Sequence, residues 1–258
     1  MAIKFRILGF PITMSWVFPA FLLFLGYISD LSGTELAVWV VFGTFAILVH
    51  ELGHAVAFRH YGLESSIAFW GLGGVTIPND QVAAVGMDDM DMLVVSLAGP
   101  AVGLVLGVIG LALQGPLASQ GPDVRSAVGT WTFVNLGWGI FNLMPIGILD
   151  GGQALAHLLR LGFGRRGQLF AIAFNIAFSA IVAAVAIANR YMFVALMAVL
   201  FGLANPYQYR ALFEGVFPKW AERRRRHEAE LRRLQSFDRV DEVPASSLLD
   251  GDWRRPQP

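Results

Sequence analysis

The feature that most constrains this chain is a series of apolar segments with lengths close to the thickness of a lipid bilayer. A helix of about 20 apolar residues crosses the bilayer core. The chain is 55% hydrophobic and only 15% charged, a composition typical of membrane proteins. The sequence therefore predicts an all-α membrane protein with six transmembrane helices. The six segments are residues 11–28, 36–58, 90–113, 128–159, 169–188 and 191–204.

The positions of Lys and Arg predict how these segments are oriented. If six helices cross the membrane from a cytoplasmic N-terminus, only Arg125 and Arg190 lie outside among the basic residues near the helix ends. Positive charge concentrates on the cytoplasmic side of membrane proteins. We therefore expect a multi-pass protein of the cell membrane with both termini in the cytoplasm. The fourth segment contains Pro145 and several glycines, so we expect it to be bent or broken.

Two further segments differ from the apolar helices. Residues 67–77 contain β-prone runs around a glycine-rich turn, which indicates a short membrane-associated β-hairpin between the second and third helices; a plain loop is the alternative. From residue 214 the composition becomes charged and helix-prone, and the end of the chain is typical of disorder. We divide the chain into a six-span core, residues 1–206, and a cytoplasmic basic helix with a disordered tail, residues 207–258.

The motif HELGH places His50, Glu51 and His54 inside the second apolar segment. On a helix the two histidines share one face, where both imidazoles can bind one metal ion while Glu51 deprotonates a water. The chain has no cysteine, so a transition-metal site must use His, Asp or Glu. The alternative is a pair of packed histidines. A charge at the membrane centre costs about 2.5–3.5 kcal/mol, however, so three ionisable groups here favour a functional site.

A third metal ligand is expected at Asp150, the carboxylate embedded in the fourth apolar segment. A proline precedes it and two glycines follow, which lets the backbone approach a neighbour closely. The predicted topology places it, like His50 and His54, towards the cytoplasmic ends of the second and fourth helices. Zinc accepts imidazole nitrogen and carboxylate oxygen, and it activates water and polarises carbonyl groups. The sequence thus predicts one zinc ion per chain and amide hydrolysis.

HELGH and the later NLMPIGILDGG, residues 142–152, together resemble the motifs of the site-2 protease family of intramembrane zinc metalloproteases. That family pairs HExxH with N-x-x-P-x-x-x-x-D-G, and the resemblance extends over residues 1 to about 206, including SLAGP at residues 96–100. It implies that zinc is held by His50, His54 and Asp150. It also implies that Glu51 is the general base and that Asn142 positions or polarises the substrate.

The chain departs from the family pattern at two places. Gly103 stands where members commonly have asparagine, and Gly147 and Ile148 stand where they often have proline. Neither departure affects a predicted ligand, so they put local geometry in question but not the chemistry. The loop at residues 60–89 is too short for an inserted PDZ domain, and the segment after residue 206 is too short for appended CBS domains. This indicates a minimal core enzyme.

The resemblance also implies a class of substrate and contact with membrane lipid. We expect an endopeptidase that cleaves single-span transmembrane proteins in regulated intramembrane proteolysis, in contact with membrane lipid. An exposed strand edge in residues 67–77 would bind the unwound substrate by strand addition. A nucleic-acid partner is not expected. The sequence leaves open the substrate's identity and the oligomeric state.

Three alternatives remain. A non-catalytic metal transporter or metal-binding membrane protein would use the same His and Asp ligands but would not need Glu51. A membrane zincin with a glutamate as third ligand is disfavoured, because Glu64 and Glu214 lie at or beyond the ends of the apolar segments. An inactive scaffold is disfavoured because every catalytic position is occupied.

Overall fold

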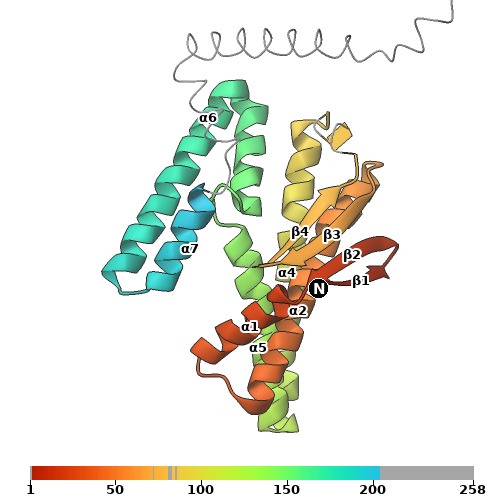
Figure 1. Ribbon diagram of the computed structural model, residues 1–258, viewed down its shortest axis with the longest axis vertical. Coiled ribbons are helices and arrows are strands. Elements are labelled where there is room, and N and C mark those ends of the chain that lie inside the picture. The colour runs from red at the N-terminus through yellow and green to blue at the C-terminus, as the bar shows by residue number, and fades with distance from the viewer. Residues whose placement is uncertain (1, 72, 81–82, 85, 204–258) are drawn as a thin grey trace, which may run out of the picture. The chain divides into compact units, whose positions relative to one another are not determined.

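The computed structural model describes residues 2–71, 73–80, 83–84 and 86–203, all within the first of two compact units, residues 1–208. The predicted basic helix and disordered tail, residues 207–258, lie outside the described residues. The described part is mostly helical and carries a small sheet (Figure 1).

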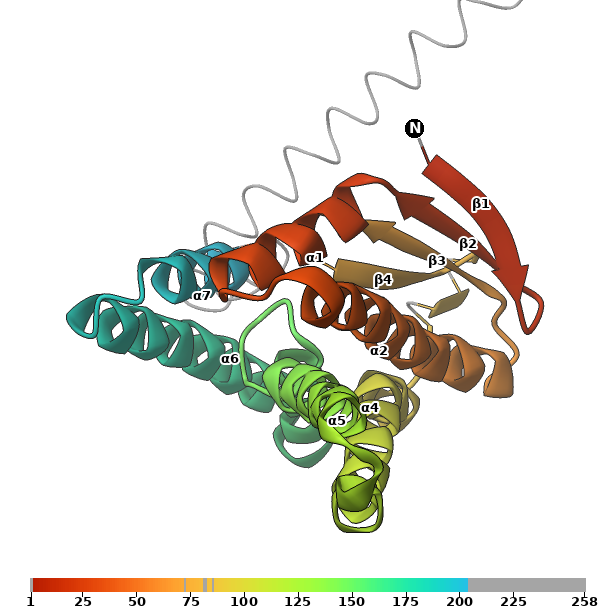
Figure 2. The same ribbon diagram turned by 90° about the horizontal axis from the view of Figure 1, so that it is seen from below.

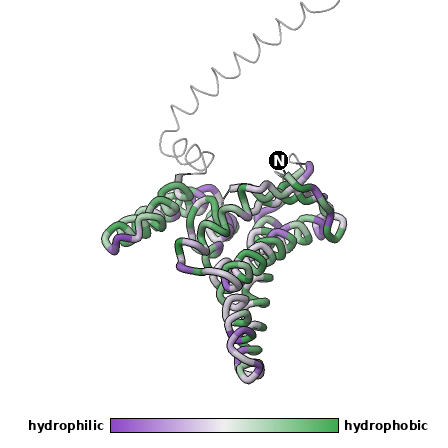
Figure 3. Tube along the Cα trace, turned by 60° about the horizontal axis from the view of Figure 1, so that its bottom comes forward, coloured by the Kyte–Doolittle hydropathy of each residue, from purple (hydrophilic) through white to green (hydrophobic). Residues whose placement is uncertain are grey.

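Three helices of the described part are long and apolar enough to cross a membrane: α2 (Gly33–His60), α4 (Asp89–Leu117) and α6 (Asp150–Ala188). Helix α5 (Pro122–Asn142) lies between α4 and α6 in the chain. Helices α1 (Val17–Ile28) and α7 (Met192–Leu203) are shorter and apolar. Figure 3 shows long hydrophobic stretches along these helices, with strongly hydrophilic residues gathered at several of their ends. Large apolar side chains on α6, such as Phe170 and Ile181, are exposed, as expected for surfaces that face lipid.

The sheet has four strands and is larger than expected. Its order is β1 (Ala2–Ile7), β2 (Phe10–Ser15), β3 (Ser65–Trp70) and β4 (Gly73–Pro78), with β2 and β3 parallel and the other pairs antiparallel. Figure 2 shows the sheet beside α1 and α2. Its buried face packs against these helices in one core, formed by Phe10, Ile12, Phe18, Leu22, Ile47, Ala55, Ile67 and Phe69.

The predicted helical class with a possible hairpin is confirmed in part, since the described residues are mostly helical. The expectation that the first helix begins at residue 11 was wrong, because residues 10–15 form strand β2. Phe10 and Ile12 lie in a strand and are 0% and 1% exposed, because pairing with β3 buries them against α1 and α2. A hydropathy count records that these side chains avoid water, but it does not distinguish burial in a protein core from contact with lipid. Helix α1 is left with 12 residues, a length of about 18 Å against a bilayer core of about 30 Å.

The fourth apolar segment is broken, as its proline predicted. Helix α5 ends at Asn142 and α6 begins at Asp150, with an irregular loop between them. Gly151 and Gly152 lie directly against the carbonyl groups of Leu143 and Ile146, where a Cβ atom would collide. The two glycines therefore allow this loop to fold back tightly on the first turn of α6.

Helix α6 contains two arms joined at Gly164, whose φ of 56° and ψ of −141° are not helical (Figure 1). A positive φ favours glycine, since a Cβ atom is strained in this region. The first arm carries Asp150 at its start, and the second arm contains the predicted fifth apolar segment, residues 169–188.

Candidate metal centre

Helix α2 places His50, Glu51 and His54 in the interior of the protein. Their side chains lie within one turn of the helix, and the residues are only 2%, 5% and 7% exposed. The i, i+4 spacing brings the two imidazole rings together, with centroids 4.9 Å apart. The spacing of residues on one helix therefore brings together two of the three predicted ligands.

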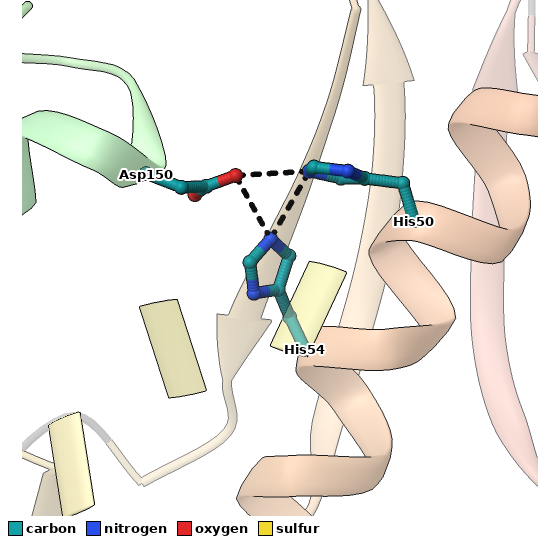
Figure 4. A group of neighbouring side chains, drawn as sticks. All are labelled: His50, His54 and Asp150. Carbon is teal, nitrogen blue, oxygen red and sulfur yellow. Dashed lines mark hydrogen bonds and ion pairs between the residues drawn. The ribbon is translucent and has the colours of Figure 1, made fainter. Parts of the chain in front are cut away.

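Asp150, the first residue of α6, completes a three-residue cluster with the two histidines (Figure 4). Its Oδ2 atom lies 3.0 Å from Nε2 of His50 and 3.3 Å from Nε2 of His54, and the two Nε2 atoms are 3.2 Å apart. Two ligands bound tetrahedrally to zinc at about 2.0–2.1 Å are roughly 3.3 Å apart. The spacing of the three atoms thus fits one tetrahedral ion.

The orientation of His54 is fixed by α4. Its Nδ1 atom lies 2.7 Å from the backbone oxygen of Val95, and a carbonyl oxygen can only accept, so Nδ1 carries a proton. In the neutral ring Nε2 then presents a lone pair to the cluster, the tautomer that a metal ligand needs. Oδ2 of Asp150 is buried without a well-aligned hydrogen bond from any described residue. A cation would satisfy these converging acceptor atoms.

The SLAGP segment explains how α4 comes so close to α2. Gly99 packs directly against the imidazole of His54, and a Cβ atom at Gly53 would lie 2.7 Å from the backbone oxygen of Ala98. These two glycines let the helix backbones approach closely, as small residues do between membrane helices. SLAGP therefore contributes packing around a predicted ligand.

Strand β4 covers Glu51. Oγ1 of Thr76 lies 2.8 Å from Oε2 of Glu51 and 3.0 Å from its backbone oxygen, and a Cβ atom at Gly74 would lie 2.6 Å from Cγ of Glu51. The sequence did not single out Thr76 or Gly74. The only signal for them is that they alternate along a strand, which becomes informative once β4 is known to pass over α2.

Asn142 is buried at the end of α5 and does not join the three-residue cluster. Its Nδ2 atom donates to the backbone oxygen of Trp138 at 2.9 Å. Asn142 does line the same cavity as His50 and Asp150, which has a volume of about 780 Å³. Most of its other lining residues are apolar and come from α1, α7, β3 and β4, among them Phe21, Leu25, Trp70, Val75, Phe193 and Met197.

A second polar cluster connects α4 to the first arm of α6. Oδ1 of Asp89 lies 2.9 Å from Nδ1 of His157, and Oδ2 lies 2.6 Å from Nε of Arg160. The neighbouring Asp88 caps α4 by accepting a hydrogen bond from the backbone nitrogen of Asp91 at 2.8 Å. These contacts tie the helix that orients His54 to the arm that begins with Asp150.

The chain is similar to several curated zinc metalloproteases, although no family model matches it. It is 29% identical over 166 residues to zinc metalloprotease MJ0392 of Methanocaldococcus jannaschii, covering 62% of this chain and 46% of that protein. It is 34% identical over 140 residues to the putative zinc metalloprotease Rip3 of Mycobacterium tuberculosis, covering 49% of this chain and 35% of that protein. The chain thus spans less than half the length of these relatives.

The fold is also similar to that of a solved structure. The site-2 protease from Methanocaldococcus jannaschii aligns with a TM-score of 0.56 at 22% identity, over 82% of this chain and 95% of that one. The similarity in sequence and the similarity in fold therefore agree. Together with the apolar helices they indicate a membrane-embedded protein. The resemblance of this chain to the site-2 protease family is confirmed.

Proposed function

We propose that this chain is an intramembrane zinc metalloprotease, an endopeptidase that cleaves transmembrane proteins. The observation that carries the proposal is the meeting of His50, His54 and Asp150, which come from two helices about 100 residues apart in sequence, with Glu51 beside them. The names of the sequence relatives and the fold of the structural neighbour support the same reaction class.

The three converging atoms fit zinc, since two imidazole nitrogens and one carboxylate oxygen are ligands that it prefers. A catalytic zinc site keeps one position free for water or substrate, and three protein ligands leave that position free. When bound, zinc would polarise a peptide carbonyl and lower the pKa of water to about 7.

Glu51 is the proposed general base. Its carboxylate would take a proton from the attacking water as the water oxygen bonds to the carbonyl carbon. It would then deliver that proton to the amide nitrogen as the C–N bond breaks. Asn142 lines the cavity beside His50 and Asp150, and its side chain is proposed to bind the substrate backbone there.

The proposed substrate is a single-span transmembrane protein. The apolar cavity beside the metal centre fits a hydrophobic segment, and β4 forms the edge of the sheet next to Glu51. A locally unwound substrate could pair its backbone with this edge strand. Such pairing would hold an extended peptide bond close to the centre.

We further propose six membrane crossings with cytoplasmic N- and C-termini. The proposed crossings are α2, α4, α5, the second arm of α6, α7, and the segment formed by β2 and α1, since α1 alone is shorter than the bilayer core. The connections from α1 to α2, α4 to α5 and α6 to α7 lie towards the same end in Figure 1. Arg125 and Arg190 belong to the latter two regions, so the proposed orientation leaves few basic residues outside.

The first experiment measures zinc per chain in the purified protein, beside His50→Ala and Asp150→Ala. We expect about one zinc in the parent and little in either variant, because each removes a ligand. His60→Ala is the matched control, since His60 ends the same helix but is not part of the cluster. Full zinc retention in Asp150→Ala would refute the joint site.

The second experiment measures cleavage of tagged single-span proteins co-reconstituted in vesicles. Glu51→Gln is expected to keep zinc but to lose cleavage at least about 100-fold, the usual contribution of a general base. A transporter using the same ligands would instead move zinc across the vesicle membrane equally well in both forms. Equal zinc flux in the parent and in Glu51→Gln, together with no cleavage by the parent, would favour the transporter.

A further inference from the structure

Thr76 occupies an unusual place in the sheet. The strand register aligns Phe5, Ile12, Ile67 and Thr76 in one row across the four strands. Ile12 and Ile67 are 1% exposed and belong to the core against α1 and α2. Thr76 is therefore the one hydroxyl in a row of otherwise apolar side chains. Valine would fit a strand position of this kind equally well, so the hydroxyl group itself needs a reason.

The hydroxyl group of Thr76 contacts both the side-chain carboxylate and the backbone oxygen of Glu51. Oγ1 lies 2.8 Å from Oε2 of Glu51 and 3.0 Å from its backbone oxygen. Gly74, two residues earlier on the same face of β4, leaves space for the Glu51 side chain, and a Cβ atom there would collide with Cγ and the carboxyl group. Strand β4 thus packs closely over the side chain of Glu51.

This arrangement restrains the Glu51 side chain. A hydroxyl has one donor position, so Oγ1 donates to one oxygen at a time. Both oxygens within reach belong to Glu51, at 2.8 Å and 3.0 Å, so either hydrogen bond holds this residue beneath β4.

We propose that Thr76 is a positioning residue that holds the side chain of Glu51 in one orientation. This inference rests on the proposed role of Glu51 as general base. It also links the edge strand to catalysis, because any displacement of β4 moves the hydroxyl group that orients the base. Substrate pairing with β4 would then align the peptide bond and the base through the same strand.

The test compares Thr76→Val, Thr76→Ser and Thr13→Val. Valine keeps the shape of threonine and removes the hydroxyl, whereas serine keeps the hydroxyl. Thr13 is the matched control, because it lies on the opposite face of the same sheet and makes no side-chain hydrogen bond with any described residue. Zinc content and the thermal unfolding midpoint are measured for each variant to establish that it folds and holds metal.

The first readout is the cleavage rate. Thr76→Val is expected to lower kcat about 10- to 100-fold with KM changed less than twofold, which is part of the contribution of a general base. Thr76→Ser is expected to restore most of the rate, and Thr13→Val to match the parent. Equal loss in the valine and serine variants, or no loss in either, would overturn the inference.

The second readout does not require cleavage. Glutamate labelled with ¹³C at the carboxyl carbon gives a resonance for Glu51 that is assigned by its disappearance in Glu51→Gln. Loss of the Thr76 hydroxyl is expected to shift this resonance, while serine is expected to keep it in place. If the parent cleaves nothing, the proposed function fails and this resonance alone decides whether Thr76 holds the side chain. An unshifted resonance in Thr76→Val would overturn the contact.

Discussion

Replacing Gly99 by alanine is expected to weaken zinc binding about 10- to 100-fold, or by about 1.4–2.8 kcal/mol. A Cβ atom at residue 99 would lie 2.7 Å from Cε1 and 2.8 Å from Cδ2 of His54, whereas an ordinary contact is 3.4–4 Å. The imidazole would have to move by roughly 1 Å, while metal–ligand distances tolerate about 0.2 Å. Helix α4 has little freedom to retreat, because Gly103 and Gly107 pack it closely against α5 on its other side.

The assay is competition for zinc between the detergent-solubilised protein and a fluorescent chelator. Gly115→Ala is the matched control, since it makes the same substitution in the same helix and a Cβ atom there meets nothing within 4 Å. Both variants gain the intrinsic helix preference of alanine over glycine, about 1 kcal/mol. A different zinc affinity is therefore due to the contact with His54. Equal affinities in the two variants would refute the argument that α4 fixes this ligand.

Three further predictions concern stability. Asp89→Asn is expected to lower the free energy of unfolding by about 1–2 kcal/mol in thermal unfolding, because it weakens a charge-assisted hydrogen bond to Arg160. Asp123→Asn, an exposed position that is also in the first turn of a helix, should cost less, at most about 0.3–1 kcal/mol. Gly151→Ala is expected to cost about 1–3 kcal/mol or more in the same measurement, because its Cβ atom would collide with the preceding loop; Gly162→Ala, which meets nothing, should cost little. Removing zinc with a chelator should lower the unfolding temperature, because zinc at 100 times its Kd adds about 2.7 kcal/mol; an unchanged temperature would argue against a structural link between metal and fold.

The motif spacings predicted much of the site because they depend on local geometry. The i, i+4 spacing of His50 and His54 fixes their relative position on any helix, so no tertiary information was needed. Pro145 and the glycines after Asp150 predicted the broken helix for the same reason, since they act on the backbone nearby. The meeting of Asp150 with the histidines required only that two antiparallel helices be neighbours.

The parts that the sequence did not predict depend on partners distant in the chain. Ile12 and Met14 were assigned to a helix because hydropathy does not reveal that Ile67 and Phe69 pair beside them. Thr76 has no distinguishing neighbours in sequence. Its importance follows from the register of β4 with β3 and from the passage of β4 over α2.

The site places four ionisable side chains in apolar surroundings, and a different element supports three of them. The backbone oxygen of Val95 on α4 binds His54, and Thr76 on β4 binds Glu51. Asp150 is the first residue of α6, where the positive end of the helix dipole favours a carboxylate. Oδ2 of Asp150 and the two Nε2 atoms of His50 and His54 lie within 3.3 Å of one another, and a bound cation would satisfy all three. Metal binding and the mutual packing of α2, α4 and α6 are therefore coupled, so a change that loosens one helix should weaken the metal even where it touches no ligand.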